Sequence, residues 1–182
     1  VKLVWNIWNP VLDEINLLWN EEYDYIVYEL SSYMLENFTP KCFISVLLNI
    51  FPDHLDWHDN FKNYKQAKLN ILSESINSLV HHNFNEDQNE YMTFWEDWDY
   101  HFKWHNFYSD NKKLFDDKSI KLKWEHNKSN ITAVIWVLDI IWIKDFSRFE
   151  KVLTNFEWLP HRLETIWTYS WITFIDDAIS TT

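Results

Sequence analysis

Glycine is absent from this chain of 182 residues. At the usual share of about 7 % of residues, a chain of this length would hold roughly 13 glycines. Tight turns and helix ends use glycine because it adopts positive φ without steric cost. Other residues must therefore occupy such positions here. The chain holds 13 tryptophans, and where they fall decides how the absence of glycine is interpreted.

Tryptophan occurs at several positions where the surrounding pattern favours glycine. Trp5 and Trp8 belong to "WNIWNP", in which Asn9-Pro10 marks a turn. Trp142 follows the apolar run "VLDII", where a helix would place a left-handed residue just after its end. Trp171 lies at the tip of a predicted hairpin, in "TYSWITF". Buried tryptophan would instead favour periodic apolar positions.

We therefore interpret most of the tryptophans as standing for glycine. Some bacteria read the codon UGA as glycine, whereas other codes read it as tryptophan, so a gene of the first kind translated with the second code gives this pattern. Few alanines and arginines among abundant Asn, Ile, Lys and Phe also fit a very AT-rich gene. Trp57 is the expected exception. The alternative is a tryptophan-rich chain with an aromatic core or a sugar-stacking surface. The recoded positions would be 5, 8, 19, 95, 98, 104, 124, 136, 142, 158, 167 and 171.

Other scarcities exclude whole classes of protein. Cys42 is the single cysteine, which excludes an intrachain disulfide and fits a reducing compartment, so we expect a cytoplasmic protein. No apolar run reaches about 18 residues, so no membrane-spanning helix is expected. The net charge of −12 argues against a nucleic-acid partner. The chain lacks an initiator Met and ends directly after a strand-like segment, so we expect both ends to be cut.

Strands alternating with helices predict an α/β protein with a mostly parallel sheet and a small antiparallel portion. The run 42–50 is almost continuously apolar, as in a strand buried on both faces of a parallel sheet. The predicted elements are strands at 23–30, 42–50 and 77–84, a short crossover at 31–40, a helix at 61–72 capped by Asp59 or Asn60, short antiparallel strands within 91–123, helices at 130–141 and 145–156, and a hairpin at 162–177.

Three polar residues follow or accompany the first two strands. Glu29 closes the first strand, His54 follows the second, and Lys68 lies on the next helix. Ligands of open α/β sheets bind beyond the carboxyl ends of strands, so these residues are candidates for a site. Taken singly, a strand-end Glu is more often a solvated edge residue, and a lone His or helix Lys is more often surface decoration.

The order and wording of the segments narrow the choice. The stretches "ELSSYMLE", "LLNIFPDHLDWH" and "YKQAKLNIL" closely resemble the Mur ligases, whose motifs are ELSS-x-x-LE, LN-x-x-x-DHLD and AK-x-x-I. "LKWEHNKSN", "FEWLPHRLE", "ITFIDDAISTT" and the opening "WNIWNP" match further motifs in the same order, so the resemblance covers essentially the whole chain. The family has Gly at the positions of Trp5, Trp8, Trp124 and Trp158. The first motif resembles most the members that add D-glutamate to UDP-N-acetylmuramoyl-L-alanine.

The resemblance implies an ATP-dependent ligase with a P-loop-type central domain. ATP converts the substrate carboxylate to an acyl phosphate, and the D-glutamate amine then attacks it. Two Mg²⁺ ions offset the charge at the transferring phosphoryl group. Glu29 matches a ligand of the Mg²⁺ shared with ATP, and His54 matches a ligand of the second Mg²⁺. Lys68 matches a carbamylated lysine. Glu29, His54 and Lys68 would form the metal site, with His54 and Lys68 as catalytic residues.

The remaining site residues implied by the resemblance are spread along the chain. Asn6 and Ser31 match residues near the muramoyl-alanine substrate. Asn127 and Asn130 match the adenine side of the ATP site, while Arg162 and Asp177 match contacts to phosphate and ribose. The family often has Lys where this chain has Ile179, which puts one phosphate or substrate contact in doubt.

The resemblance also predicts the domain organisation. Residues 1–156 would form the central ATP-binding domain, and residues 157–182 would start the C-terminal ligase domain. The phosphate loop ending in GK[ST] is absent from the sequence and would lie upstream, so the isolated chain should be an inactive fragment of a monomeric enzyme. The alternatives are another Mur ligase, a folylpolyglutamate synthase-like ligase, or a non-catalytic, tryptophan-rich binding module.

Overall fold

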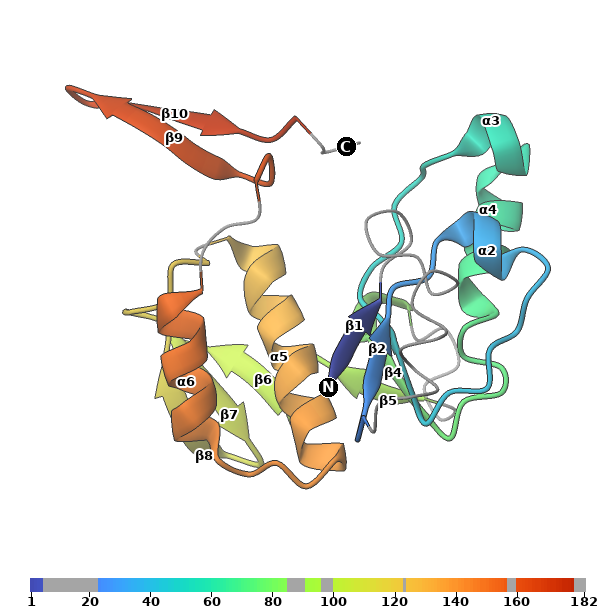
Figure 1. The fold of residues 1–182 in the computed structure, drawn as a ribbon, viewed down its shortest axis with the longest axis horizontal. Helices are drawn as coiled ribbons and strands as arrows, with labels where there is room; N and C mark the ends of the chain where they lie inside the picture. The colour runs from blue at the N-terminus through green and yellow to red at the C-terminus, as the bar shows by residue number, and fades with distance from the viewer. Residues whose placement is uncertain (5–22, 85–90, 96–99, 123, 157–159, 179–182) are drawn as a thin grey trace.

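The computed structural model describes residues 1–4, 23–84, 91–95, 100–122, 124–156 and 160–178. Parallel strands and short helices form one part of this structure, an antiparallel sheet covered by two helices forms another, and a hairpin projects beyond them (Figure 1). The elements are β1 (Lys2–Val4), β2 (Ile26–Tyr28), α2 (Ser32–Leu35), β3 (Ile44–Leu47), α3 (Leu55–His58), α4 (Phe61–Leu69), β4 (Asn77–His81), β5 (Met92–Phe94), β6 (Tyr100–Lys103), β7 (Asn106–Ser109), β8 (Lys112–Asp116), α5 (Glu125–Ile140), α6 (Phe146–Asn155), β9 (Glu164–Tyr169) and β10 (Ile172–Asp176).

The parallel strands form two small sheets. β1 pairs with β2, and β3, β4 and β5 pair in that order, all in parallel. The mixed α/β class predicted from the sequence is confirmed. Leu47, Ile50, Tyr64, Leu72 and Val80 form a buried cluster between β3, β4 and α4. This cluster holds α4 against the sheet, close to the loop that follows β3.

The strands predicted at 23–30 and 42–50 are shorter and more exposed in the structure than the sequence suggests. β2 has three residues, and Ile26 and Val27 are 50 % and 53 % exposed. Among the described residues β2 pairs with β1 alone, so this apolar run forms a largely exposed strand. β3 alternates, with Ser45 and Leu47 buried and their neighbours half-buried.

Helix starts follow the sequence signals closely. The Asn60 side chain accepts a hydrogen bond from the Asn63 amide at 3.0 Å, which caps α4 as predicted. The Ser31 hydroxyl accepts from the Met34 amide at 3.3 Å and caps α2. Both caps fix the chain direction just after a segment that carries candidate site residues.

The antiparallel part has its own core. β6, β7 and β8 pair in order, and α5 and α6 cover the sheet (Figure 1). The buried residues shared by this sheet and its helices are Tyr100, Phe107, Phe115, Ile120, Ile131, Ile135 and Leu153.

None of the helices in the described ranges is long and apolar enough to cross a membrane.

In two hairpin turns of this sheet, residues other than glycine adopt positive φ. Asp110 and Asn111, between β7 and β8, both have positive φ, which Asn and Asp tolerate. Trp104 and His105, between β6 and β7, have φ of 50° and 63°. A bulky residue at positive φ is an outlier, and the Trp104 side chain is 79 % exposed, so little burial offsets the strain.

The end of α5 is a Schellman motif with tryptophan at the glycine position. The Ile143 amide donates to the Leu138 carbonyl at 2.8 Å and the Trp142 amide to the Asp139 carbonyl at 3.0 Å. Trp142 has φ 63° and is 83 % exposed. The prediction that Trp142 occupies a left-handed position, followed by a hydrophobic residue, is confirmed.

Most of the described tryptophans in the predicted set are exposed, as expected if they stand for glycine. Trp104, Trp124, Trp142, Trp167 and Trp171 are exposed, at 45 % or more. For Trp171, however, the positive φ belongs to its neighbour, Ser170.

Trp95 and Trp136 differ from the other tryptophans. Trp95 has φ 81° but is buried and stacks on Phe102, while Trp136 stacks on Tyr100 at 5.1 Å between ring centroids. At these two positions the aromatic-core alternative fits the packing. Trp5, Trp8, Trp19, Trp98 and Trp158 lie outside the described residues.

We expect Trp142→Gly to stabilise the protein by about 1 kcal/mol, because a left-handed L-residue costs about 1–2 kcal/mol and glycine's own chain entropy offsets part of the gain. Loss of the exposed contact between the Lys144 ammonium and the Trp142 ring should subtract little. Urea unfolding measures the change. Asn111→Gly is the matched control, since Asn tolerates its positive φ; equal effects of the two substitutions would contradict the strain argument.

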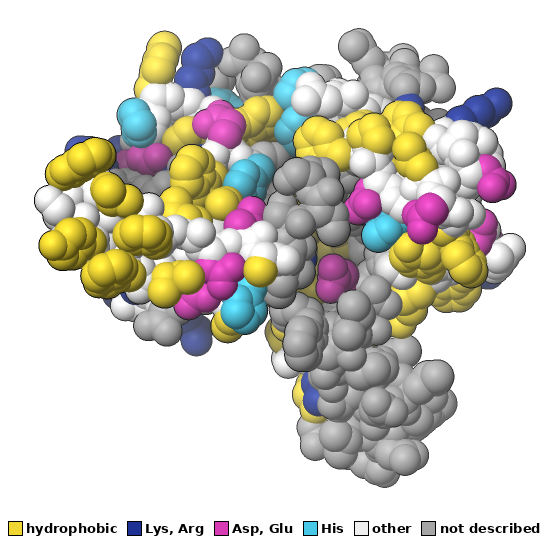
Figure 2. Space-filling model, turned by 90° about the horizontal axis from the view of Figure 1, so that it is seen from above, with side chains coloured by type: hydrophobic (Ala, Val, Ile, Leu, Met, Phe, Trp, Pro, Cys, Tyr) yellow, Lys and Arg dark blue, Asp and Glu magenta, His cyan; other side chains and the backbone are white. Residues whose placement is uncertain are grey.

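The β9–β10 hairpin contributes little to either core. Its apolar side chains gather on an outer face of the molecule (Figure 2), and Trp167 stacks on Phe174 at 5.4 Å within the hairpin itself. Apolar residues exposed along both strands are Ile166, Trp167, Tyr169, Trp171, Ile172, Phe174 and Ile175. A two-stranded hairpin alone is marginally stable in water, so we expect this segment to be less stable than the two sheets with buried cores.

Candidate functional site

Glu29 follows β2 directly. Its amide donates to the Val4 carbonyl at 3.2 Å, which extends the pairing of β2 with β1 by one residue. Its side chain is exposed, so no core contact accounts for this carboxylate. Ser31, two residues later, caps α2 with its hydroxyl oxygen.

His54 lies at the start of α3 in the left-handed conformation, with φ 52°. Its amide donates to the Asp53 carboxylate at 2.8 Å, and its Nε2 lies 3.5 Å from the other Asp53 oxygen. The imidazole lies against Tyr33, with 4.9 Å between ring centroids. The strained backbone and these contacts fix where the imidazole points. Strain of this kind is typical of functional sites.

Lys68 lies in the last turn of α4 and is half-buried. Burial lowers the pKa of its ammonium, although the negative charges of Asp53 and Glu29 oppose the change. Its Nζ lies 5.6 Å from the centre of the Tyr64 ring. A lysine with a lowered pKa holds more of its population as the neutral amine at a given pH.

These contacts bring the three predicted metal-site residues into one neighbourhood. Asp53 and Glu29 both act on the Lys68 charge. His54 lies 6.4 Å from Tyr64, the ring that Lys68 overlies. Since Glu29 follows β2 and His54 follows β3, the group forms where loops leave two different sheets.

The group also contains residues that the sequence reasoning did not single out. Asp53 contributes a carboxylate beside His54, and Tyr33 and Tyr64 provide the rings between the charged side chains. All three lie within or beside the quoted motifs. Their place in the same motifs as the candidate ligands was the signal by which the sequence could have identified them. The oxygens of Glu29 and Asp53 suit Mg²⁺, which prefers carboxylate ligands.

Asn127 and Asn130 lie in the first turns of α5, three residues apart and therefore on one face. The Asn127 Nδ2 is buried and has no hydrogen-bond partner among the described residues. An unpaired buried amide is costly, which makes it a candidate donor to a ligand. Trp124, just before the helix, offers no side-chain cap and is exposed.

A buried ion pair fixes the start of α5, and sequence reasoning missed it. Lys128 Nζ lies 3.0 Å from the Asp117 carboxylate, with the lysine side chain almost fully buried. Burial would raise the pKa of Asp117, but hydrogen bonds and charges from Lys128 and His105 lower it overall. This pair ties α5 to the segment after β8, next to Asn127.

Arg162 and Asp177 lie at the base of the hairpin. His161 and Leu163, on either side of Arg162, have positive φ, and the Leu163 amide donates to the Asp177 carboxylate at 3.1 Å. Asp177 is therefore held by the backbone beside Arg162.

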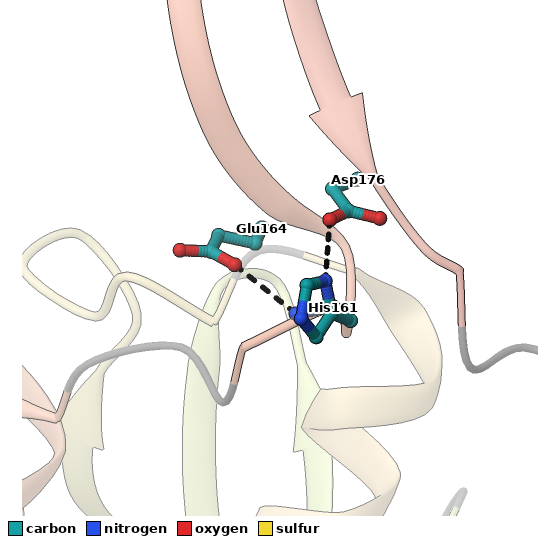
Figure 3. A group of neighbouring side chains, drawn as sticks. All are labelled: His161, Glu164 and Asp176. Carbon is teal, nitrogen blue, oxygen red and sulfur yellow. Dashed lines mark hydrogen bonds and ion pairs between the residues drawn. The ribbon is translucent and has the colours of Figure 1, made fainter.

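Three side chains clasp the same turn (Figure 3). The His161 Nδ1 bonds the Asp176 carboxylate at 2.6 Å, and the His161 amide donates to Glu164 at 3.0 Å. The hydrogen bond to the Asp176 carboxylate raises the pKa of His161, and the same bond lowers the pKa of Asp176. Their ligating atoms lie within 4.8 Å of one another, but these hydrogen bonds already account for the grouping.

The predicted residues thus fall into three places. Glu29, His54 and Lys68 form one group, the two asparagines lie on α5, and Arg162 and Asp177 lie at the base of the hairpin. Asn6 lies outside the described residues.

Comparison with known proteins gives a consistent answer. The family described as Mur ligase middle domain matches residues 11–141, well over half of the chain. The UDP-N-acetylmuramoylalanine–D-glutamate ligase of Francisella tularensis subsp. mediasiatica is 33 % identical over 98 % of this chain, and that of subsp. novicida is 32 % identical over 98 %. The chain spans 40 % of the length of each.

Two solved structures share the fold. The UDP-N-acetylmuramate–alanine ligase MurC of Thermotoga maritima gives a TM-score of 0.61 at 22 % identity, covering 84 % of this chain and 38 % of its own. The MurF ligase of Thermotoga maritima, solved with ADP, gives 0.58 at 15 % identity, covering 97 % and 47 %. The resemblance seen in the sequence motifs is confirmed, and the chain belongs to the Mur ligase family.

Proposed function

We propose that this chain is the nucleotide- and metal-binding part of an ATP-dependent ligase of peptidoglycan precursor synthesis, which joins D-glutamate to UDP-N-acetylmuramoyl-L-alanine. The relatives at 32–33 % identity carry that name, and the ELSS-x-x-LE motif favours the same substrates. Residues 1–156 would belong to the central domain and 157–182 to the next one. Such an enzyme would work in the cytoplasm as a monomer.

The observation that carries the proposal is the environment of Lys68. Burial lowers the pKa of its ammonium, and carbamylation requires the neutral amine. The neutral Nζ attacks the carbon of CO₂, a proton leaves to solvent, and the product carries anionic oxygens. Burial therefore favours the chemistry that turns a repelling ammonium into a ligand for Mg²⁺.

The other residues would orient the substrates. Glu29, Asp53 and the carbamate of Lys68 would offer oxygens for two Mg²⁺ ions, and His54 would offer a nitrogen at the same place. Bound Mg²⁺ would offset the negative charge of the phosphoryl group transferred from ATP to the substrate carboxylate. Ser31 and Asn6 would contact the muramoyl-alanine substrate.

The ATP site would draw on the other two places in the chain. The unpaired amide of Asn127 and the side chain of Asn130, on one face of α5, would contact adenine. Arg162 would contact phosphate and Asp177 ribose. The hydrogen bond from the Leu163 amide to the Asp177 carboxylate supports this assignment, because it orients the carboxylate beside Arg162.

The direct test is a ligase assay on the full-length enzyme. We expect phosphate release from ATP only when Mg²⁺, UDP-N-acetylmuramoyl-L-alanine and D-glutamate are all present, with L-glutamate as the matched control. Phosphate release that follows a different amino acid would assign the protein to another member of the family. No release with any amino acid would contradict the ligase proposal.

A further inference from the structure

A buried histidine outside the proposed metal ligands links two of the site's segments. His58, the last residue of α3, is 2 % exposed. Its Nε2 lies 3.1 Å from the hydroxyl of Ser32, the first residue of α2. α2 follows Glu29, and α3 begins just after His54. His58 therefore connects the segments that carry two proposed ligands.

α3 cannot hold its own conformation. It has four residues, its N-cap makes no side-chain hydrogen bond, and His54 and Asp59 at its two ends both have positive φ. An isolated helix of this length is unstable, because fixing the first turn costs more than its few hydrogen bonds return. Two strained residues add to that cost, so contacts with other elements must hold α3 in place.

Those contacts converge on the end of α3 next to α2 and α4. Trp57 donates its indole N–H to the Glu36 carboxylate at 3.1 Å, and the Asn63 amide side chain donates to the His58 carbonyl at 3.0 Å. The Trp57 side chain is 58 % exposed, whereas the His58 ring is enclosed. Of these anchors His58 is therefore the buried one, and its removal would leave a cavity and an unpaired Ser32 hydroxyl.

The same ring supports the aromatic side chains of the site. The His58 ring lies 5.7 Å from Tyr33 and 5.5 Å from Tyr64. Tyr33 contacts the His54 ring at 4.9 Å, and Tyr64 underlies the Lys68 ammonium. His58 thus contacts both aromatic residues that flank the proposed ligands on α3 and α4.

We propose that His58 is a positioning residue for the metal site, which holds His54 and the Glu29 segment in register by bonding Ser32 and packing between Tyr33 and Tyr64. This inference rests on the proposed function. It assigns His58 no contact with metal or substrate. Replacing His58 should therefore change the Mg²⁺ concentration that the enzyme needs for activity, and not only the stability of the fold.

The test compares Mg²⁺ dependence in variants of the full-length enzyme. We expect His58→Leu, which keeps the bulk but not the hydrogen bond, to raise the Mg²⁺ concentration for half-maximal activity by about 10-fold or more, as is usual when a residue that orients a metal ligand is lost. His58→Gln, which can still reach Ser32, should recover part of that loss. Ser32→Ala should shift the Mg²⁺ dependence in the same direction, and it decides the matter if His58→Leu does not fold.

His101→Leu is the matched control, because His101 is a buried histidine on β6 that stacks on Tyr108, away from α2 and α3. It should lower the Tm and leave the Mg²⁺ dependence unchanged. An active wild-type enzyme whose Mg²⁺ dependence is unaffected by both His58→Leu and Ser32→Ala would overturn the inference. An inactive wild-type enzyme would instead overturn the proposed function.

Discussion

Lys68→Ala in the full-length enzyme should lower kcat by at least about 100-fold, because it removes the side chain proposed to carry anionic oxygens to Mg²⁺. Short-chain carboxylates such as acetate should restore part of the activity, since they can place similar oxygens in the space left by the lysine. The steady-state rate, measured with and without added carboxylate, checks both statements. Full activity of the variant without any additive would refute the carbamate role.

Lys65→Ala is the matched control for this substitution. Lys65 lies on the same helix, about one turn before Lys68. We expect the control to keep its activity and to gain nothing from acetate. A carboxylate effect of equal size on both variants would show that acetate acts elsewhere on the protein.

The second large effect concerns the tryptophans. Trp95, Trp104 and Trp142 are all held at positive φ, and each such strained residue costs about 1–3 kcal/mol. Several together would consume much of a typical stability of about 5–15 kcal/mol. The literal sequence should therefore form aggregates on expression. A version of the complete gene with glycine at the twelve predicted positions should be soluble, with Trp57 retained.

Trp57 should remain tryptophan for a structural reason. Its indole N–H donates to Glu36, and it lies within α3 rather than at positive φ. Trp57→Gly in the glycine version is thus the matched control and should destabilise the protein. Mass spectrometry of the native protein tests the recoding itself, because Trp and Gly differ greatly in residue mass. Peptides from residues 1–20 with tryptophan at positions 5 and 8 would count against the idea.

Elements governed by local signals could be predicted from the sequence. The cap at Asn60, the helix ending before Trp142, and the hairpin around Ser170 each depend on a few neighbouring residues, and the structure has all three. The extent of β2 could not be predicted, because its exposure depends on which elements cover it rather than on its own apolar pattern. The packing of Trp136 could not be predicted either, since its stacking on Tyr100 joins distant parts of the chain.

The candidate site also combines features that local sequence predicts with features that depend on distant packing. Glu29, His54 and Lys68 could be chosen from motifs and strand ends, but their mutual arrangement depends on the left-handed conformation of His54 and on the rings of Tyr33 and Tyr64. Nothing in the local pattern distinguishes His58 from its exposed neighbours. Its burial arises only when α2, α3 and α4 meet.

The most direct measurement of the central claim is ¹³C NMR of the full-length enzyme in ¹³C-bicarbonate. We expect a carbamate signal that belongs to Lys68, strengthens when Mg²⁺ is added, and disappears in Lys68→Ala but not in Lys65→Ala. The burial that lowers the pKa of Lys68 should make the signal appear at a lower pH than for a free lysine. An enzyme that is active with Mg²⁺ but shows no carbamate signal would contradict the carbamate role of Lys68. A carbamate signal that persists in Lys68→Ala would contradict it as well.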